Sequence, residues 1–326
     1  MKTRLIYLII IVLSLGLTLG LTQNNAGAAD KTFINMAGGS SGGTWYTMAV
    51  GVCKVVDEKL PDMNCTPQTG GSVKNTRQVG SKKLDFGFST ADTAFHALNG
   101  GPEFKAGERF PDIRAVFSGH VSHWHMVTLE NSGIKTIEDL RGKRVAIGYV
   151  GGSVETVTRE ILKEYGLIPD KDFKKFYYRH TGVVTALKDG TIDAGAILTG
   201  APSGALMDLA TTHKMRLLPI GPEMQDRLIK KFPYYIKGYF EVGVYPKLTE
   251  KIPTLTVGTY LITDKDTDAK LVYSLAKVIS ESTAELAELH PAGKQWSLET
   301  VKKGIAIPIH PGAMKLFKEK GISFSQ

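Results

Sequence analysis

The feature that most constrains the fold of this chain is a repeated order of strand, glycine-rich loop and helix. In the first copy, the apolar stretch 33–37 leads through the small residues 38–43 into an amphipathic helical pattern. In the second copy, the strand-like stretch 144–150 leads through the loop 151–153 into another helical pattern. Strands that alternate with helices in this way predict an α/β fold with a mostly parallel sheet.

A second pair of segments repeats at nearly the same distance along the chain. The segment 79–87 is echoed by 186–195, and its Asp85 corresponds to Asp193, an offset of 108 (193 minus 85). The serine loops of the two copies are offset by 113 (153 minus 40). We therefore expect two lobes of similar topology. Because ligands of open α/β sheets bind beyond the carboxyl ends of the strands, we expect the site in a cleft between the lobes.

The last part of the chain is predicted to complete the first lobe. It has a strand pattern at 254–262, a helix pattern at 268–290 and a short helix after Pro311. The chain would then cross between the lobes near 120–127 and again near 253–259, and two crossing strands make a hinge that closes on a ligand. The predicted boundaries are 29–122 and 257–326 for lobe I, and 123–256 for lobe II.

The N-terminus has the layout of a secretory signal peptide. A basic head at residues 1–4 precedes the apolar run 5–21, and the small residues Ala26-Gly27-Ala28 form a cleavage signal. The alternative is a permanent membrane anchor, but a run of 17 residues (5 to 21) is at the short limit of a membrane span. We predict removal of residues 1–28 and export of the mature protein to the periplasm.

The charge of the chain narrows the classes of binding partner, and its two cysteines raise the question of a disulfide. The formal charge falls from +8 to +6 when the signal peptide removes Lys2 and Arg4, which suits an anionic small ligand without specifying one. The chain has no dense run of basic residues interleaved with aromatic ones, which argues against nucleic acid. Cys53 and Cys65 suggest either an intramolecular disulfide worth about 3 kcal/mol or two buried thiols.

Four kinds of site place a glycine-rich loop between a strand and a helix. A phosphate-binding P-loop needs a lysine where this chain has Thr44, and the dinucleotide fingerprint needs a glycine where it has Ser40. A nucleophile elbow is the enzyme alternative, since residues 38–42 fit the pattern Gly-x-Ser-x-Gly. Against it, the pattern lies on the first strand of the mature chain, and no histidine follows a late strand in an obvious loop.

The remaining chemistry is the binding of a small anion, which requires no catalytic group, cofactor or metal. Free N–H groups and the helix dipole favour an anion at a helix N-terminus. Ser40, Ser41 and Thr44 add hydroxyl donors in the first loop, and its glycines let a carboxylate approach the backbone. The same reasoning applies to the loop 70–72, with Asn75 behind it, and to 151–153.

A histidine-rich strand adds a further candidate. His123 and His125 alternate to one face of this strand, a spacing that suits Zn²⁺. We favour ordinary hinge or cleft histidines, with His123 able to donate to a ligand carboxylate. Three basic residues could pair with the charge of the ligand: Lys74, Arg77 and Arg179. The alternative is that each is a solvated surface residue.

Several segments resemble the TAXI class of solute receptors of TRAP transporters. In order along the mature chain, the matching segments are 37–46, 69–75, 89–92, 137–145, 187–194 and 307–313. The resemblance implies a type II-like, two-lobed periplasmic binding protein that captures a small carboxylate, such as an amino acid or a dicarboxylic acid. It also implies that the solute is delivered to membrane-embedded TRAP permease subunits.

Two places depart from the family pattern. Val154 stands at the last position of the usual Gly-Ser-Gly-Thr, and Thr90-Ala91-Asp92 stands where Gln-Ser-Asp is usual. Because both places are expected to face the ligand, the family's best-known ligand, glutamate, should not be assumed. The residues predicted to contact the ligand are Ser40, Ser41, Gly42, Gly43, Thr44, Tyr46, Gly71, Ser72, Asn75, Thr90, Asp92, His123, Gly151, Gly152 and Ser153.

Two other functions stay open beside this non-enzymatic one. A secreted serine hydrolase would use Ser40 as its nucleophile. A ligand-sensing subunit would report the bound solute to a membrane receptor instead of a permease, and the same loops would serve it.

Overall fold

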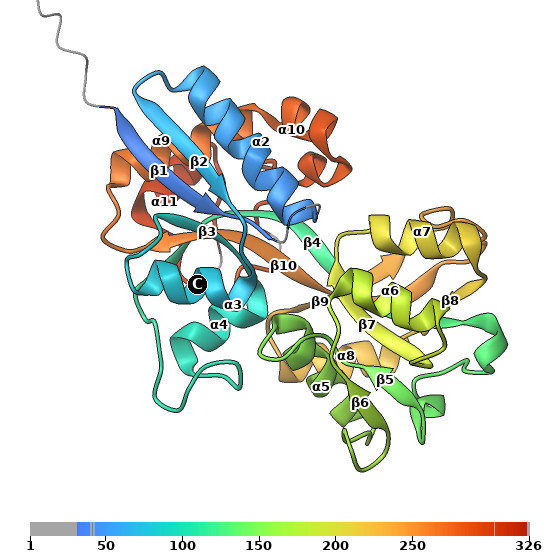
Figure 1. Cartoon of the computed structure of the whole chain (residues 1–326). Helices are drawn as coiled ribbons and strands as arrows, with labels where there is room; N and C mark the ends of the chain where they lie inside the picture. The colour runs from blue at the N-terminus through green and yellow to red at the C-terminus, as the bar shows by residue number, and fades with distance from the viewer. Residues whose placement is uncertain (1–30, 40, 42, 303, 325–326) are drawn as a thin grey trace, which may run out of the picture.

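The computed structural model describes residues 31–39, 41, 43–302 and 304–324. The predicted signal peptide, Ser40 and Gly42 lie outside the described residues. The chain forms two α/β lobes that are joined by two long strands (Figure 1). The predicted two-lobed fold with crossing strands is thus confirmed, while the exact lobe boundaries stay a prediction.

Lobe I is built from the first part of the chain and from its C-terminal helices. Its first elements are β1 (Thr32–Ala37), α2 (Thr44–Lys59), β2 (Met63–Gln68), α3 (Ser72–Gly80), β3 (Phe86–Thr90) and α4 (Ala91–Asn99). Its last elements are α9 (Ala269–Glu281), α10 (Thr283–Leu289), η3 (Pro291–Gln295) and α11 (Pro311–Glu319). The C-terminal helices α9 and α10 pack against α2 (Figure 1).

Lobe II is formed by the middle of the chain. It begins with η1 (Glu130–Ser132), η2 (Glu138–Leu140), β5 (Arg144–Ala146), α5 (Ser153–Glu164), β6 (Lys174–Phe176) and α6 (His180–Lys188). It continues with β7 (Ala194–Thr199), α7 (Gly204–Thr212), β8 (Met215–Leu217), α8 (Pro222–Lys231) and β9 (Tyr235–Phe240). No helix in the described part of the chain is long and apolar enough to cross a membrane.

One sheet runs through both lobes. Its strand order is β2-β1-β3-β10-β4-β7-β5-β6, with β8 paired to β4 and β9 paired to β10. The central pair, β4 (Ile113–Leu129) and β10 (Ile252–Asp264), is antiparallel, whereas the outer pairs of each lobe are parallel. Because β4 and β10 contribute residues to both lobes, they form the predicted hinge (Figure 1).

The internal repeat seen in the sequence is also a structural repeat. Asp85 accepts a hydrogen bond from the backbone N–H of Asn35, at 2.8 Å, and so fixes the turn before β3 to β1. Asp193 accepts a hydrogen bond from the backbone N–H of Arg144, also at 2.8 Å, and fixes the turn before β7 to β5. The two equivalent aspartates therefore hold equivalent pairs of parallel strands, one pair in each lobe.

Two predicted elements differ from the structure. The predicted helix 268–290 is interrupted at Ser282, where the backbone leaves helical angles, and the break lets Leu286 of α10 pack against Gly51 of α2. The predicted strand 144–150 ends at Ala146, and Gly148 follows with a φ of 110°. At that left-handed φ the chain turns away from the sheet, which a glycine tolerates at low cost.

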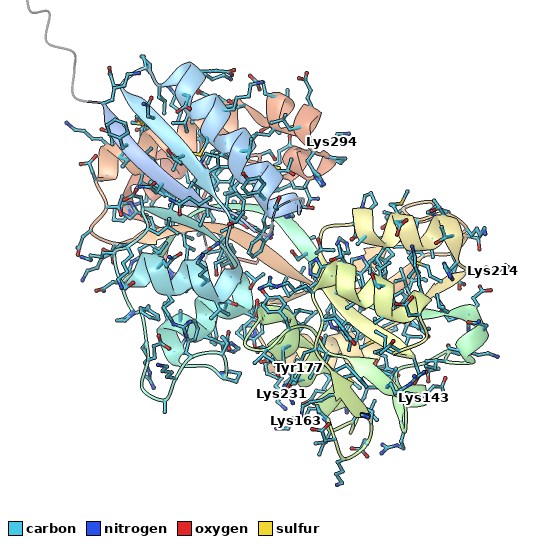
Figure 2. The ribbon with its side chains drawn as sticks, viewed as in Figure 1. Lys143, Lys163, Tyr177, Lys214, Lys231 and Lys294 are labelled. Atoms are coloured by element: carbon cyan, nitrogen blue, oxygen red, sulfur yellow. A yellow bond between two sulfur atoms is a disulfide. The ribbon has the colours of Figure 1, made fainter. Side chains whose placement is uncertain are left out.

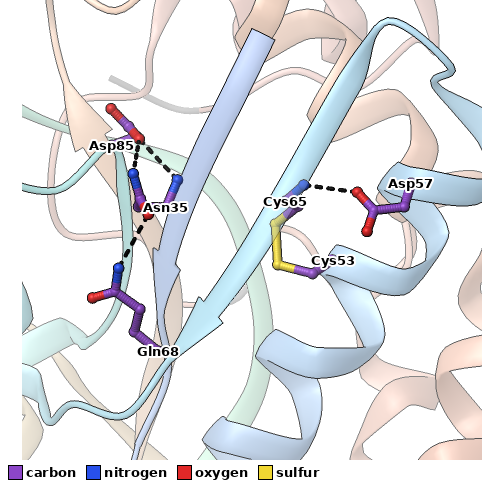
Figure 3. The surroundings of a disulfide bond; sticks show 6 residues. All are labelled: Asn35, Cys53, Asp57, Cys65, Gln68 and Asp85. Carbon is purple, nitrogen blue, oxygen red and sulfur yellow. Dashed lines mark hydrogen bonds between the residues drawn. A yellow bond between two sulfur atoms is a disulfide. The ribbon is translucent and has the colours of Figure 1, made fainter. Parts of the chain in front are cut away.

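The two cysteines are joined by a disulfide bond. Cys53 of α2 and Cys65 of β2 are bonded, which confirms the disulfide and shows that the alternative of two free thiols is wrong (Figure 3). The backbone N–H of Cys65 also donates to the carboxylate of Asp57, at 2.7 Å. The helix α2 is therefore attached to its neighbouring strand by a covalent bond and a hydrogen bond.

Candidate functional site

Three of the predicted loops end at helix N-termini that a glycine caps. Gly43 precedes α2, Gly71 precedes α3 and Gly152 precedes α5. A glycine has no side chain with which to accept hydrogen bonds from the first-turn N–H groups. Each of these helix starts therefore offers backbone donors and the positive end of a helix dipole to an anion.

A chain of hydroxyl groups connects the two lobes next to these helix starts. The hydroxyl of Ser72, the first residue of α3, lies 2.9 Å from that of Thr90. Thr90 in turn donates to the hydroxyl of Ser153, the first residue of α5 in lobe II, at 3.0 Å. Ser153 donates to Oδ2 of Asp92, in the first turn of α4, at 2.7 Å. All four side chains are buried, so the lobes are in direct contact here.

Asp92 is the charged group at the centre of this contact. It is fully buried, and its Oδ1 atom has no hydrogen-bond partner among the described residues. Burial, and to a smaller extent the charge of Glu103, raises the pKa of the Asp92 carboxyl above its usual range. A protonated Asp92 can donate to an anion, and an ionised one can accept a hydrogen bond from a polar group of a solute.

Asn75 holds the loops in place instead of facing a ligand freely. Its Nδ2 atom lies within hydrogen-bond distance of the carbonyl oxygens of Gly38 (2.8 Å), Phe88 (2.9 Å) and Ala37 (3.1 Å). Its Oδ1 atom accepts from the N–H of Gly71 at 3.2 Å. The side chain is completely buried, so it fixes the ends of β1 and β3 and the start of α3 relative to one another.

A second place where the lobes approach one another, called the second contact below, lies at the start of α2. A Cβ atom placed on Gly200, after β7, would lie 3.8 Å from the hydroxyl of Thr44 and 3.7 Å from the ring of His120. Nδ1 of His120 accepts a hydrogen bond from the indole N–H of Trp296 at 3.1 Å. Burial lowers the pKa of His120 to about 3, so its ring is neutral and carries its proton on Nε2.

His120 therefore presents a buried N–H group to this contact. Its Nε2 atom has no partner among the described residues, and the side chain is 1% exposed. An unsatisfied buried donor costs about 1–3 kcal/mol, so a bound acceptor group would stabilise the site. His120 is not among the predicted contacts, although it lies on the histidine-rich strand that supplies the candidate His123.

Tyr149 is a second residue that the sequence did not point to. Its hydroxyl lies 3.5 Å from the position of a Cβ atom placed on Gly71, across the lobe boundary. The guanidinium of Arg179 lies over the Tyr149 ring, 4.4 Å from its centroid, in a cation–π contact. Arg179 is therefore a cation near the site. Arg77 forms an ion pair with Glu108 at 2.7 Å.

The ligand contact of His123 stays a prediction, and both histidines of the β4 pair lie among aromatic side chains of lobe II. His123 packs against the ring of Phe240, with ring centroids 5.4 Å apart, and burial lowers its pKa to about 4. Nε2 of His125 forms a hydrogen bond with the hydroxyl of Tyr245, at 2.8 Å. Within the described residues, no group of three or more histidine, cysteine, aspartate and glutamate side chains is arranged to hold a metal ion.

The structure brings together only part of the predicted set. The residues gathered at the contact of α3, α4 and α5 are Gly71, Ser72, Asn75, Thr90, Asp92, Gly152 and Ser153. Gly43 and Thr44 lie at the second contact, and Tyr46 is half-buried on α2. Ser41 and Gly151 are exposed, and the N–H of Gly151 donates to Glu155 at 2.9 Å.

Two hollows are found elsewhere, on lobe II. One, of about 540 Å³, has Arg216, Lys247 and Lys251 among its lining residues. The other, of about 440 Å³, is lined in part by Lys214, which lies at the outer edge of lobe II, far from lobe I (Figure 2). Neither hollow includes a residue of the predicted site, whose lobes are in contact in this structure.

Comparison with solved structures identifies the class of the fold. The periplasmic aliphatic sulphonate binding protein of Escherichia coli superposes with a TM-score of 0.51 at 15% identity, over 88% of this chain and 83% of that chain. A binding protein component of an ABC phosphonate transporter from Pseudomonas aeruginosa gives a TM-score of 0.52 at 14% identity, over 82% of this chain and 80% of that chain. The fold is that of a periplasmic solute-binding protein.

The family follows from the sequence itself. The model of the NMT1-like family matches residues 36–321, which is nearly the whole described chain. This chain belongs to the NMT1-like family.

Proposed function

We propose that this chain is an extracytoplasmic solute-binding protein that holds a small carboxylate between its lobes. The observation that carries the proposal is that glycine-capped helix starts from both lobes, at Gly71 and Gly152, meet at one group of buried hydroxyls. Helix N-termini favour an anion, and the hydroxyls of Ser72, Thr90 and Ser153 supply donors that orient it.

The hinge explains how a solute reaches a buried site. Rotation about β4 and β10 would separate Ser153 from Thr90 and Asp92 and would open the contact to solvent. Closure around a solute would then exchange these direct hydrogen bonds for bonds to the solute. Binding and release need no covalent step, so the proposed activity is not enzymatic.

The membrane partner is proposed from the resemblance to TAXI receptors. Under this proposal the mature protein works in the periplasm and delivers an amino acid or an organic acid to TRAP permease subunits. The two solved structures that share the fold are a sulphonate-binding protein and a component of an ABC phosphonate transporter, so sulfonates and phosphonates belong in the test beside carboxylates. Solute-dependent uptake with TRAP permease subunits in vesicles supports delivery, and binding without uptake supports the sensing alternative.

The proposal is tested by thermal denaturation of the mature chain, stripped of solute and then mixed with amino acids, keto acids, dicarboxylates, sulfonates or phosphonates. A solute at about 100 times its dissociation constant stabilises the fold by roughly 2.7 kcal/mol, which raises the midpoint by several degrees. We expect one class of carboxylate to give this shift.

Serine variants at the two ends of α3 localise the binding. Ser72→Ala removes a hydroxyl at the start of α3 and is expected to lower the shift strongly, whereas Ser81→Ala, at the end of α3, is expected to leave it unchanged. The proposal is contradicted if no acid shifts the midpoint. In that case, labelling by a fluorophosphonate that is lost in Ser40→Ala would favour the serine hydrolase.

A further inference from the structure

A buried cluster of titratable side chains connects the lobes beside the proposed solute site. On the lobe I side, Nδ1 of His96 in α4 lies 2.9 and 3.1 Å from the two carboxylate oxygens of Glu103. The side chain of His96 is 10% exposed and that of Glu103 is fully buried. No part of the proposed solute contact uses this pair, which therefore needs another explanation.

The lobe II side of the cluster is built around Glu160 of α5. Its Oε1 accepts from the hydroxyl of Tyr234 at 2.9 Å, and its Oε2 accepts from the hydroxyl of Tyr235 at 2.5 Å. Both tyrosines, at the start of β9, are at most 2% exposed. One glutamate of lobe II thus has a hydrogen-bond donor on each of its oxygens.

The two halves meet across the lobe boundary. The hydroxyl oxygen of Tyr234 lies 3.2 Å from Nε2 of His96, and Oε1 of Glu160 lies 3.8 Å from the same nitrogen. The ring of Phe95 in α4 also packs against that of Tyr234, with centroids 5.5 Å apart. The continuous series Glu103–His96–Tyr234–Glu160–Tyr235 is called the interlobe relay below.

The hydrogen-bond directions show which protonation state the relay requires. Glu103 can only accept when ionised, so Nδ1 of His96 donates to it. Tyr234 gives its proton to Glu160, so its oxygen must accept from Nε2 of His96. With Glu160 ionised, the relay is fully satisfied when both ring nitrogens of His96 carry a proton. If Glu160 holds that proton instead, it donates to the hydroxyl oxygen of Tyr234, and Tyr234 donates to Nε2 of a neutral His96. In both forms the relay needs one proton beyond the one on Nδ1. Loss of that proton breaks the link between the lobes.

We propose that the interlobe relay makes closure of the two lobes proton-linked, so that the closed protein holds protons that the open protein releases. The inference rests on the proposed function, in which the lobes open and close around a solute, and it names how that movement is regulated. A solute would be held most firmly in a mildly acidic medium and released more readily as the pH rises.

The charges around the relay favour uptake of a proton on closure, which is the direction of pH dependence proposed above. Burial opposes the charged form of His96, but its hydrogen bond to Glu103 and the charges of Glu103, Asp92 and Glu160 raise its pKa overall. Burial raises the pKa of Glu160 to about 7, against the lowering by its bond to Tyr235, and the charge of Asp92 adds to the rise. Of the charges that raise the pKa of His96, that of Glu160 acts from the other lobe and is lost when the lobes separate. The charge of Asp92 likewise raises the pKa of Glu160 from the other lobe. Separation removes both effects, so opening favours loss of a proton and a rising pH favours opening.

The inference is tested on the solute-free mature chain by fluorescence energy transfer between the lobes. Dyes are attached at Lys294→Cys in lobe I and Lys214→Cys in lobe II, two exposed positions on opposite lobes (Figure 2). If closure takes up one proton, the ratio of closed to open protein falls by up to about tenfold per pH unit as pH rises from about 6 to 8.

Variants of the relay separate it from other titrating groups. Glu160→Gln keeps a polar side chain that does not titrate, and Tyr234→Phe keeps the packing on Phe95 but removes the hydroxyl. Both are expected to reduce the pH slope to less than half. His213→Gln is the matched control, because His213 bonds to the exposed Thr212, and it should keep the wild-type slope.

The outcomes distinguish the relay from the binding function. If folded Glu160→Gln and Tyr234→Phe both retain the wild-type slope, or if the wild-type lobe separation is independent of pH, the inference is overturned. Solute binding is measured separately at pH 6 by calorimetry on the same samples. A protein that binds no solute but shows the relay-dependent slope contradicts the proposed function and leaves the proton linkage standing.

Discussion

At the scale of single residues, Asp92 and Asp193 show how one residue type is used in two ways. Asp193 accepts hydrogen bonds from the backbone and side chain of Arg144, which lower the pKa of its carboxyl. Asp92 is enclosed with one oxygen lacking a partner among the described residues, and its pKa is raised. Asp193 therefore stabilises a pair of strands, whereas Asp92 lowers the stability of the fold when it is ionised.

Asp92→Asn is therefore expected to stabilise the fold at high pH. The pKa of Asp92 is raised in the folded state, so its favourable contribution is present at low pH and is lost as the pH rises through the folded pKa. Each unit of that rise is worth about 1.4 kcal/mol. Thermal denaturation at pH 5 and pH 8 should show Asp92→Asn gaining on the wild type at pH 8.

Asp193→Asn is the control for this prediction, because its effect on stability should change with pH in the opposite direction. The pKa of Asp193 is lowered, so the variant should lose more stability at pH 8 than near pH 3. If Asp92→Asn loses stability relative to the wild type as pH rises, the carboxyl is not held in the environment described here.

Asn75→Ala is expected to destabilise the fold by on the order of 2–3 kcal/mol. The substitution leaves the buried carbonyl groups of Gly38 and Phe88 and the N–H of Gly71 without their partner. Chemical denaturation measures the loss. Asn99→Ala, which removes one exposed hydrogen bond to Phe95, should cost much less. Equal losses would show that Asn75 does not organise the loops.

At the scale of elements, the sequence predicted best what depends on local pattern. The strands and helices around the loops 38–43 and 70–72 follow from alternation of apolar residues and from glycine. The break of the last long helix at Ser282 was missed, because it depends on packing of Leu286 against Gly51, far away in the sequence. Whether Cys53 and Cys65 form a disulfide likewise depends on how α2 packs against β2.

The disulfide of lobe I should contribute to stability and not to solute binding. The double variant Cys53→Ala/Cys65→Ala is expected to lower the free energy of unfolding by about 3 kcal/mol. Cys53 lies about 13 Å along α2 from its start at Thr44, so solute affinity should stay within about twofold of the wild type. Chemical denaturation and calorimetry measure the two effects, and a large loss of affinity in the folded variant would contradict this separation.

At the scale of the whole molecule, contacts between lobes were the hardest feature to predict. Thr90, Asp92 and Ser153 were selected from loop chemistry and family resemblance, and they meet across the lobe boundary. Thr90 and Asp92 lie in one of the two segments where the chain departs from the TAXI pattern, and Ser153 precedes Val154 in the other. The sequence does not predict the contacts of His120, Tyr149 and the interlobe relay, since no short sequence spacing links these residues to their partners in the other lobe.

Under the proposed function, a small anion is held between the two lobes at their facing helix starts. Hydrogen–deuterium exchange of the mature chain, with and without the solute found by thermal denaturation, tests it most directly. We expect slower exchange in the first turns of α3 and α4 in lobe I and of α5 in lobe II, together with the hinge strands β4 and β10. Protection confined to one lobe, or to the lobe II hollow lined by Arg216 and Lys251, would contradict it.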